Sequence, residues 1–151
     1  QLTPAVLENA REMTFWLTKC QSMSSLLRVE PHISKFNGTN VHVALETLIR
    51  LVGGHGQHEE RFISRVLDRA GESAHSFDAR ILSRTLVSAS KLGVKPAPAA
   101  LQALLMRLAH LVRECSERDA TDCARALADW GVAVGPELVR ELHCRVPRDV
   151  V

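Results

Sequence analysis

The feature of this sequence that most constrains its fold is an apolar pattern that returns after about 38 residues. Residues 86–94 and 124–132 carry apolar or small side chains at matching positions, and both stretches end in Gly-Val, at Gly93 and Gly131. A looser copy, at a shift of 41, places three leucines in the same positions, namely Leu45, Leu48 and Leu51. A fixed interval of this length is typical of helical solenoids, in which each hairpin buries its apolar face against its neighbours.

Apolar side chains recur every three or four residues along the chain, which predicts helices rather than strands. The first series, from Val6 to Cys20, predicts one continuous helix capped by Thr3. Further helices are expected after Ser22, at 41–52 capped by Asn40, from about His58 to Gly71, from Ser76 to Gly93, at 101–112, from Ser116 to Gly131 in a capping box with Asp119, and after Gly135.

The expected fold class is therefore all-α, a helical-hairpin repeat solenoid of about three to four helix-turn-helix units of roughly 38–41 residues. The whole chain, 1–151, is expected to form one array. Its parts are N-terminal helices at 1–38, a first repeat at 39–75, a second at 76–115 and a terminal third at 116–146. Leu86 is expected to lie buried in the seam between neighbouring hairpins.

The composition agrees with closely packed helices. Hydrophobic residues make up 46% of the chain but aromatic residues only 4%, so Ala, Leu and Val must supply most of the core. No apolar run approaches the ~18 residues that cross a bilayer, and we expect no membrane partner. The formal net charge of +2 is weak for a protein that would hold RNA by charge alone.

Nothing in the sequence predicts catalysis. No phosphate loop, HExxH motif or ordered Ser-His-Asp set is present, and we expect neither an enzyme nor a small-molecule substrate. His55 and His58 lie among glycines that would hold a metal ion poorly, and His110 is expected to be a packed or edge residue. The four cysteines form no CxxC pair, so free, mostly buried thiols are expected rather than a metal site, and no cofactor is predicted.

Three arginines recur every four residues on one predicted helix, at Arg61, Arg65 and Arg69. The apolar residues of that helix face the other way, so the arginines are expected to line its exposed side. Such a row would contact phosphates and position RNA without reading its sequence. The alternative is a solvated face that is partly paired with Asp68 and Glu72.

A second candidate surface comes from the repeat register. Arg50, Lys91 and Asp129 occupy one equivalent position in the first helices of the three repeats. Such positions line one wall of a solenoid, as in base-reading helical repeats, although an unconstrained surface would vary in the same way. Arg80 and Arg84 could extend this wall, and Lys35 could contact a backbone phosphate near the Asn37-Gly38 turn.

Two stretches resemble a known family. One is Thr18-Lys-Cys-Gln-Ser-Met-Ser-Ser-Leu-Leu with Lys35-Phe-Asn-Gly-Thr-Asn-Val-His-Val-Ala-Leu-Glu-Thr-Leu-Ile-Arg-Leu, and the other is Leu86-Val-Ser-Ala-Ser-Lys-Leu-Gly-Val. Together with the repeat period, they resemble the octotricopeptide repeats and the related repeats of RAP-domain and FAST-kinase-like organelle RNA-processing proteins. The resemblance covers residues 18–94 well and 95–146 more weakly, and no RAP-type domain is present.

This resemblance implies an RNA-binding subunit of a mitochondrial, or alternatively plastid, ribosome or ribonucleoprotein that contacts ribosomal RNA and neighbouring protein subunits. The length of 151 residues favours a subunit over a free RNA-maturation factor, because sequence-specific repeat readers need many units. A third possibility is a protein scaffold that docks through its Leu-rich helices without RNA contact, and the near-neutral charge favours it.

Overall fold

The computed structural model describes residues 1–52 and 59–145, and all its regular elements in these ranges are helical. They are α1 (Pro4–Glu8), α2 (Ala10–Lys19), α3 (Met23–Leu27), η1 (Glu30–Lys35), α4 (Gly38–Val52), α5 (Glu60–Ser73), η3 (Ala74–Ser76), α6 (Ala79–Lys91), α7 (Pro98–Leu111), η4 (Val112–Glu114), α8 (Glu117–Asp129) and α9 (Pro136–Arg145). The all-α expectation is confirmed for the described residues.

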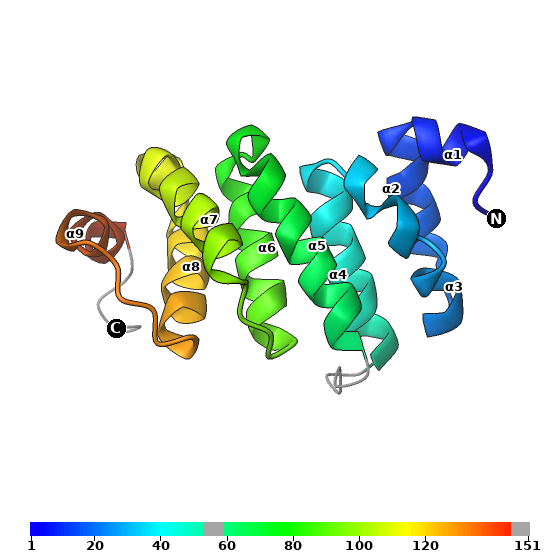
Figure 1. The fold of residues 1–151 in the computed structure, drawn as a ribbon. Coiled ribbons are helices and arrows are strands. Elements are labelled where there is room, and N and C mark those ends of the chain that lie inside the picture. Colours follow the sequence, from blue (N-terminus) through cyan, green and yellow to red (C-terminus); the bar gives the residue numbers. More distant parts are fainter. Residues whose placement is uncertain (53–58, 146–151) are drawn as a thin grey trace.

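The helices form two layers (Figure 1). In the first layer, α2, α4, α6 and α8 pack successively side by side. In the second, α5 packs against α7 and the short η1 packs on the other side of α5. The N-terminal helices and α9 lie at opposite ends of the row. Side chains that follow one another along a layer therefore come from segments far apart in the sequence.

The helix bounds repeat at one interval. α6 begins at residue 79 and α8 at 117, while α5, α7 and α9 begin at 60, 98 and 136, so all three steps are equal. The short helices η3 and η4 begin at 74 and 112, which is the same step again. The interval found in the apolar pattern is thus an interval of the secondary structure as well.

Two glycines end helices as the sequence predicts. Gly93 and Gly131 follow the C-caps of α6 and α8 with φ of +74° and +63°. In each case the N–H of the next valine donates to the carbonyl five residues earlier, at 3.2 and 3.0 Å, which is the bond of a Schellman motif. Only glycine adopts this left-handed backbone without a steric penalty, and the helices stop here for that reason.

Gly71 does not close its helix, contrary to the expectation from sequence. α5 continues to Ser73, and Gly71 lies where α5 crosses α7. A Cβ at this position would lie 2.7 Å from the Cα of Ala100, which is closer than packed atoms approach one another. The glycine therefore permits close approach of two helices and does not cap one.

The prediction of a single N-terminal helix from the first apolar series is also wrong. Thr3 caps α1 as predicted, but the chain breaks at Asn9. The side chain of Asn9 accepts hydrogen bonds from the N–H groups of Arg11 and Glu12, at 2.9 and 3.3 Å, and so begins α2. An asparagine that satisfies free amides in this way starts a new helix, even within a continuous apolar series.

Two other helix starts differ from the sequence prediction. Asn37, not Asn40, caps α4: each of these asparagines accepts from the backbone N–H of the other, at 2.8 and 3.0 Å. Asp78, not Ser76, caps α6 by accepting from Ile81 N at 2.8 Å. The start expected near His58 lies outside the described residues.

Ser116 caps α8 by accepting from Asp119 N at 3.0 Å, as predicted. The second hydrogen bond of a capping box would run from the backbone N–H of Ser116 to the Asp119 side chain. The carboxylate of Asp119 instead accepts from Ser83 Oγ on α6 at 3.0 Å. The start of α9 at Pro136, after Gly135, is as the sequence predicts.

One apolar core runs through both layers. It extends from Met13 on α2 to Leu142 on α9, and its largest fully buried side chains include Phe36, Phe62 and Phe77. Leu86 is 1% exposed, so its predicted burial is confirmed.

Candidate nucleic-acid interface

The second layer carries arginines that differ sharply in exposure. Arg69, expected on the exposed side of α5, is instead half-buried. Its Nε donates to the carbonyl oxygen of Phe36 at 2.9 Å, and its Nη1 lies 3.5 Å from Glu72 Oε1. The expectation of three exposed arginines is therefore wrong for Arg69, whose hydrogen bond links α5 to the end of η1.

Arg61 and Arg65 do lie on the exposed side of α5, as expected. Arg61 Nε lies 3.6 Å from Glu30 Oε1, but its side chain remains 80% exposed. A surface ion pair of this kind contributes little to stability, and its arginine can exchange the carboxylate for another anion. Arg65 forms no ion pair with any described residue.

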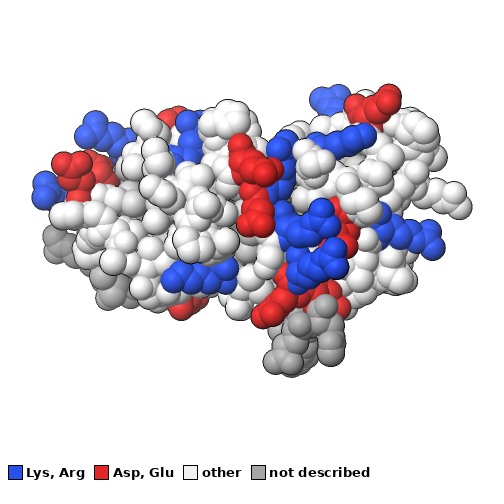
Figure 2. Space-filling view, in the orientation of Figure 1, with Lys and Arg blue, Asp and Glu red and all other residues white. Residues whose placement is uncertain are grey.

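The packing of η1 against α5 adds one further cation to this surface. Glu30 and Phe36, at the two ends of η1, contact Arg61 and Arg69 on α5, so the two elements run alongside each other. Lys35, the residue before Phe36, is exposed. We call Lys35, Arg61 and Arg65 the basic face. Figure 2 shows Lys and Arg side chains gathered over the middle of the molecule, around α5, with Asp and Glu side chains beside them.

Arg28, which follows the short helix α3, is also exposed but is not part of this face. It lines a separate hollow of about 300 Å³ together with Trp16, Lys19 and Ser25.

An acidic border limits the basic face on the side of α7. A hollow of about 390 Å³ between α5 and α7 is lined by Asp68, Gly71, Glu72, Ala99 and Ala100. Its two carboxylates would repel a phosphate backbone that crossed from α5 to α7. An anionic ligand is therefore better accommodated along η1 and α5 than across both second-layer helices.

The proposed base-reading wall lies on the first layer and is largely engaged in contacts between helices. Arg50 Nη2 donates to the carbonyls of Thr18 and Cys20, at 3.2 and 2.8 Å, and so satisfies the C-terminal end of α2. Asp129, at the equivalent position, accepts from Ser90 Oγ at 2.7 Å.

The remaining candidates on the first layer are Arg80, Arg84 and Lys91. Arg84 Nη1 lies 3.6 Å from Glu46 Oε1 on α4, and the same carboxylate oxygen lies 3.2 Å from His42 Nδ1. Arg80 and Lys91 are exposed. The structure therefore divides the predicted site residues between two layers and gathers only Lys35, Arg61 and Arg65 around one short surface.

The cysteines are free thiols. Cys20, Cys115 and Cys123 are buried and Cys144 is exposed. Burial raises the pKa of each of the three buried thiols, most strongly at Cys123, which keeps them protonated and poorly nucleophilic. Among the described residues, no group of three His, Cys, Asp or Glu side chains is placed to hold a metal ion. His55 and His58 lie outside those residues.

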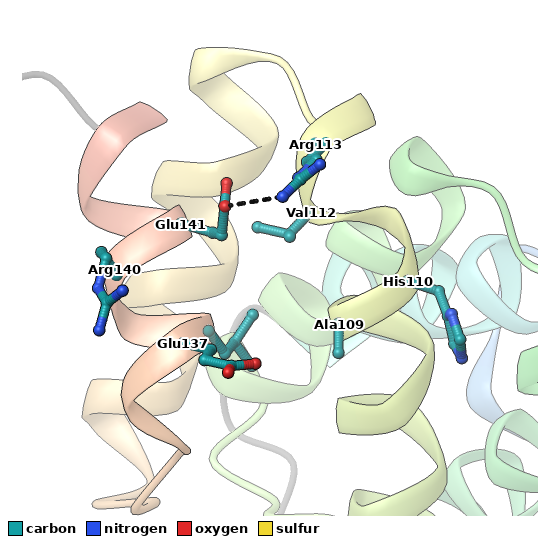
Figure 3. Close-up of a pocket in the computed structure, with 8 residues that line it drawn as sticks. Ala109, His110, Val112, Arg113, Glu137, Arg140 and Glu141 are labelled. Atoms are coloured by element: carbon teal, nitrogen blue, oxygen red, sulfur yellow. Dashed lines mark hydrogen bonds and ion pairs between the residues drawn. The ribbon is translucent and has the colours of Figure 1, made fainter.

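A cleft separates α7 from α9 (Figure 3). One part, of about 560 Å³, is lined on one wall by Ala109, His110, Val112 and Arg113, and on the other by Glu137, Leu138, Arg140 and Glu141. Arg113 spans it to Glu141 at 3.5 Å, while His110 and Arg140 point away from it. The other part, of about 550 Å³, has a mainly apolar lining that includes Leu101, Leu105, Met106, Val134 and Leu138.

No helix in the described part of the chain is both long and apolar enough to span a membrane. Comparisons of the chain with protein-family models, with curated proteins and with solved structures find no match.

Proposed function

We propose that this chain is a helical-hairpin solenoid that binds RNA as a non-enzymatic subunit of a mitochondrial ribosome or ribonucleoprotein. The basic face carries the proposal. Lys35 on η1 and Arg61 and Arg65 on the adjoining α5 are exposed, and the one described carboxylate that pairs with them, Glu30, holds Arg61 only loosely. Exposed arginines and lysines in this arrangement bind phosphate oxygens and position a nucleic acid without reading its bases.

The solenoid part of the proposal is supported by the common interval of sequence and helix bounds. Successive first-layer helices pack on one another, and so do α5 and α7. Hairpins stacked in this way expose their second helices along one side, which offers an extended surface to a long partner.

Ribosomal RNA and a mitochondrial location rest on the resemblance of residues 18–94 to octotricopeptide and FAST-kinase-like repeats, with a plastid as the alternative. The small basic face favours phosphate contact within a larger assembly. Three cations cannot supply the strong, salt-dependent affinity that a free RNA-maturation factor would need.

Crosslinking in the native complex tests this function. Ultraviolet crosslinking followed by mass spectrometry is expected to place RNA adducts on peptides that contain residues 28–35 and 60–69. Adducts confined to α8 and α9, or protein–protein crosslinks alone over α3, η1 and α5, would contradict it. The first-layer residues Arg50, Arg80, Arg84 and Lys91 are expected to give weaker adducts, because Arg50 and Arg84 already bind protein groups.

A protein scaffold is the second candidate, and the apolar part of the α7–α9 cleft favours it. Met106 is 60% exposed there, beside Leu101 and Leu105. An exposed apolar surface of this kind is common where proteins dock. A scaffold that uses only this surface would leave the basic face without RNA adducts.

A further inference from the structure

In both α5 and α7, an arginine at the same position along the helix donates a hydrogen bond to the end of a short 3-10 helix. Arg69 is the tenth residue of α5 and Arg107 the tenth of α7. Their Nε atoms donate to the carbonyl oxygens of Phe36 and Phe77, both at 2.9 Å, and these phenylalanines end η1 and η3. The same hydrogen bond thus ties two successive second-layer helices to the turns that they cover.

Arg145 occupies the equivalent position in α9 but does not form the equivalent hydrogen bond with a described residue. It is the tenth residue of α9, and Cys115 ends η4 as Phe77 ends η3. Both members of this pair lie one repeat interval after Arg107 and Phe77. The Nε of Arg145 is buried, however, and has no hydrogen-bond partner among the described residues. A buried N–H without an acceptor is unfavourable and rare, and here an equivalent acceptor exists in the Cys115 carbonyl.

The side chains that line the cleft between α7 and α9 differ in size from those at the contact of α5 with α7. Gly71 meets Ala100 where α5 crosses α7. The residues one repeat interval later are Ala109 and Leu138, which carry a methyl group in place of hydrogen and an isobutyl group in place of methyl. Both line the two parts of the cleft, and α9 packs on α8 and η4. The larger pair therefore leaves less room for α9 to approach α7 than Gly71 and Ala100 leave between α5 and α7.

We propose that α9 exchanges between this open position and a docked position, in which Arg145 Nε donates to the Cys115 carbonyl oxygen and α9 closes the cleft against α7. Leu138 opposes closure and the arginine hydrogen bond favours it. The device is a conformational switch at one end of the array, and it does not depend on RNA binding.

Exchange of arginine Nε–H protons with water tests this in the unmodified protein. Nuclear magnetic resonance of the nitrogen-15-labelled chain is expected to show slow exchange for Arg69 and Arg107. The exchange rate of the Arg145 Nε–H should be intermediate, at least about tenfold lower than that of the exposed Arg65. Arg→Lys variants at each position assign the signals. Exchange at Arg145 as fast as at Arg65 would overturn the proposal, and the wild-type spectrum decides this even if a variant does not fold.

The Leu138→Ala variant tests the opposing side chain. Removing the isobutyl group should increase the docked population and slow the exchange of the Arg145 Nε–H by about threefold or more. Val139→Ala, on the same helix but outside the cleft lining, is the matched control and should leave the rate unchanged. Equal effects of the two substitutions, or faster exchange in Leu138→Ala, would show that Leu138 does not hold the pair open.

Discussion

Gly71 on α5 and Ala100 on α7 meet so closely that a Cβ on the glycine would lie 2.7 Å from the alanine Cα and 2.9 Å from its Cβ. The atoms it would meet include backbone, which cannot turn aside as a flexible side chain can. The contact between α5 and α7 thus depends on the absence of a methyl group at Gly71.

The Gly71→Ala variant is therefore expected to lose stability, although alanine ordinarily improves a helix interior. Overpacking costs about 1–3 kcal/mol, whereas the gain in helix propensity is at most about 1 kcal/mol. Denaturant unfolding followed by circular dichroism measures the difference. Gly135→Ala is the control, because nothing lies within 4 Å of a Cβ built there. A variant as stable as the wild type would mean that the helices cross farther apart.

Leu86 tests the register of the stacked helices. The side chain is 1% exposed on α6, and its truncation to alanine should lower the free energy of unfolding by about 2–5 kcal/mol, from lost burial and the cavity left behind. Leu27, which is 38% exposed, is the matched control and should lose less than about 1 kcal/mol. A loss below about 0.5 kcal/mol at Leu86 would contradict its place in the core.

Gly93 and Gly131 should respond alike, because both hold the left-handed position after a helix. Alanine at either site is expected to cost about 1–2 kcal/mol in strain, since nothing within 4 Å obstructs the added methyl group. Asparagine, which tolerates this conformation better, should cost less. Thermal unfolding of the four variants measures this, and a neutral Gly→Ala change would show that the helix ends differently.

The thiols give a prediction of reactivity. At mildly alkaline pH a thiol reagent should label Cys144 rapidly in the native chain and reach Cys20, Cys115 and Cys123 only on unfolding, because burial blocks access and raises the pKa of all three. Labelled peptides identified by mass spectrometry distinguish the sites. Rapid labelling of Cys20 in the folded protein would contradict the packing of α2.

The same burial makes stability depend on pH. An unfolded cysteine loses its proton near its ordinary pKa of 9.0, whereas folded Cys123 keeps its proton well above that. The unfolded chain therefore binds fewer protons above about pH 9, so the contribution of Cys123 is present below that pH and is lost as pH rises. Urea unfolding measured across this range should show the decline, and a Cys123→Ala variant should show less of it.

Local patterns predicted the all-α fold, the helix ends at Gly93 and Gly131, and the burial of Leu86, because helical periodicity and left-handed glycines act within a few residues. They failed where a side chain had two possible partners. Asn9 could have remained in a long helix but caps a new one, and Asp119 could have completed a capping box but bonds to α6. Which partner wins depends on helices distant in sequence.

The candidate site was less predictable for the same reason. The row Arg61, Arg65 and Arg69 has one spacing, yet Arg69 turns to the Phe36 carbonyl because η1 lies beside it. Lys35 joins the surface only through the packing of η1 on α5. A helical face can be read from spacing, but the carbonyls and carboxylates that cover part of it belong to other segments.

The affinity for RNA should depend on salt concentration as expected for phosphate contacts. Replacing Arg61 and Arg65 with alanine is expected to reduce the slope of log affinity against log salt by up to about 0.7 per lost contact for single-stranded RNA, and to do so equally for unrelated sequences. Titration of a labelled RNA at several salt concentrations measures the slope. A change limited to one sequence would indicate base reading at this face.

The most direct test of the central claim compares two charge-reversed proteins. Arg61→Glu with Arg65→Glu alters the basic face, while Arg118→Glu with Arg125→Glu makes the same change in net charge at exposed positions on α8. The affinity for a mixed-sequence RNA, measured by fluorescence anisotropy at fixed salt, should fall by about tenfold or more in the first variant and far less in the second. Equal losses in both variants, or no loss in the first, would contradict RNA binding by the α5 surface.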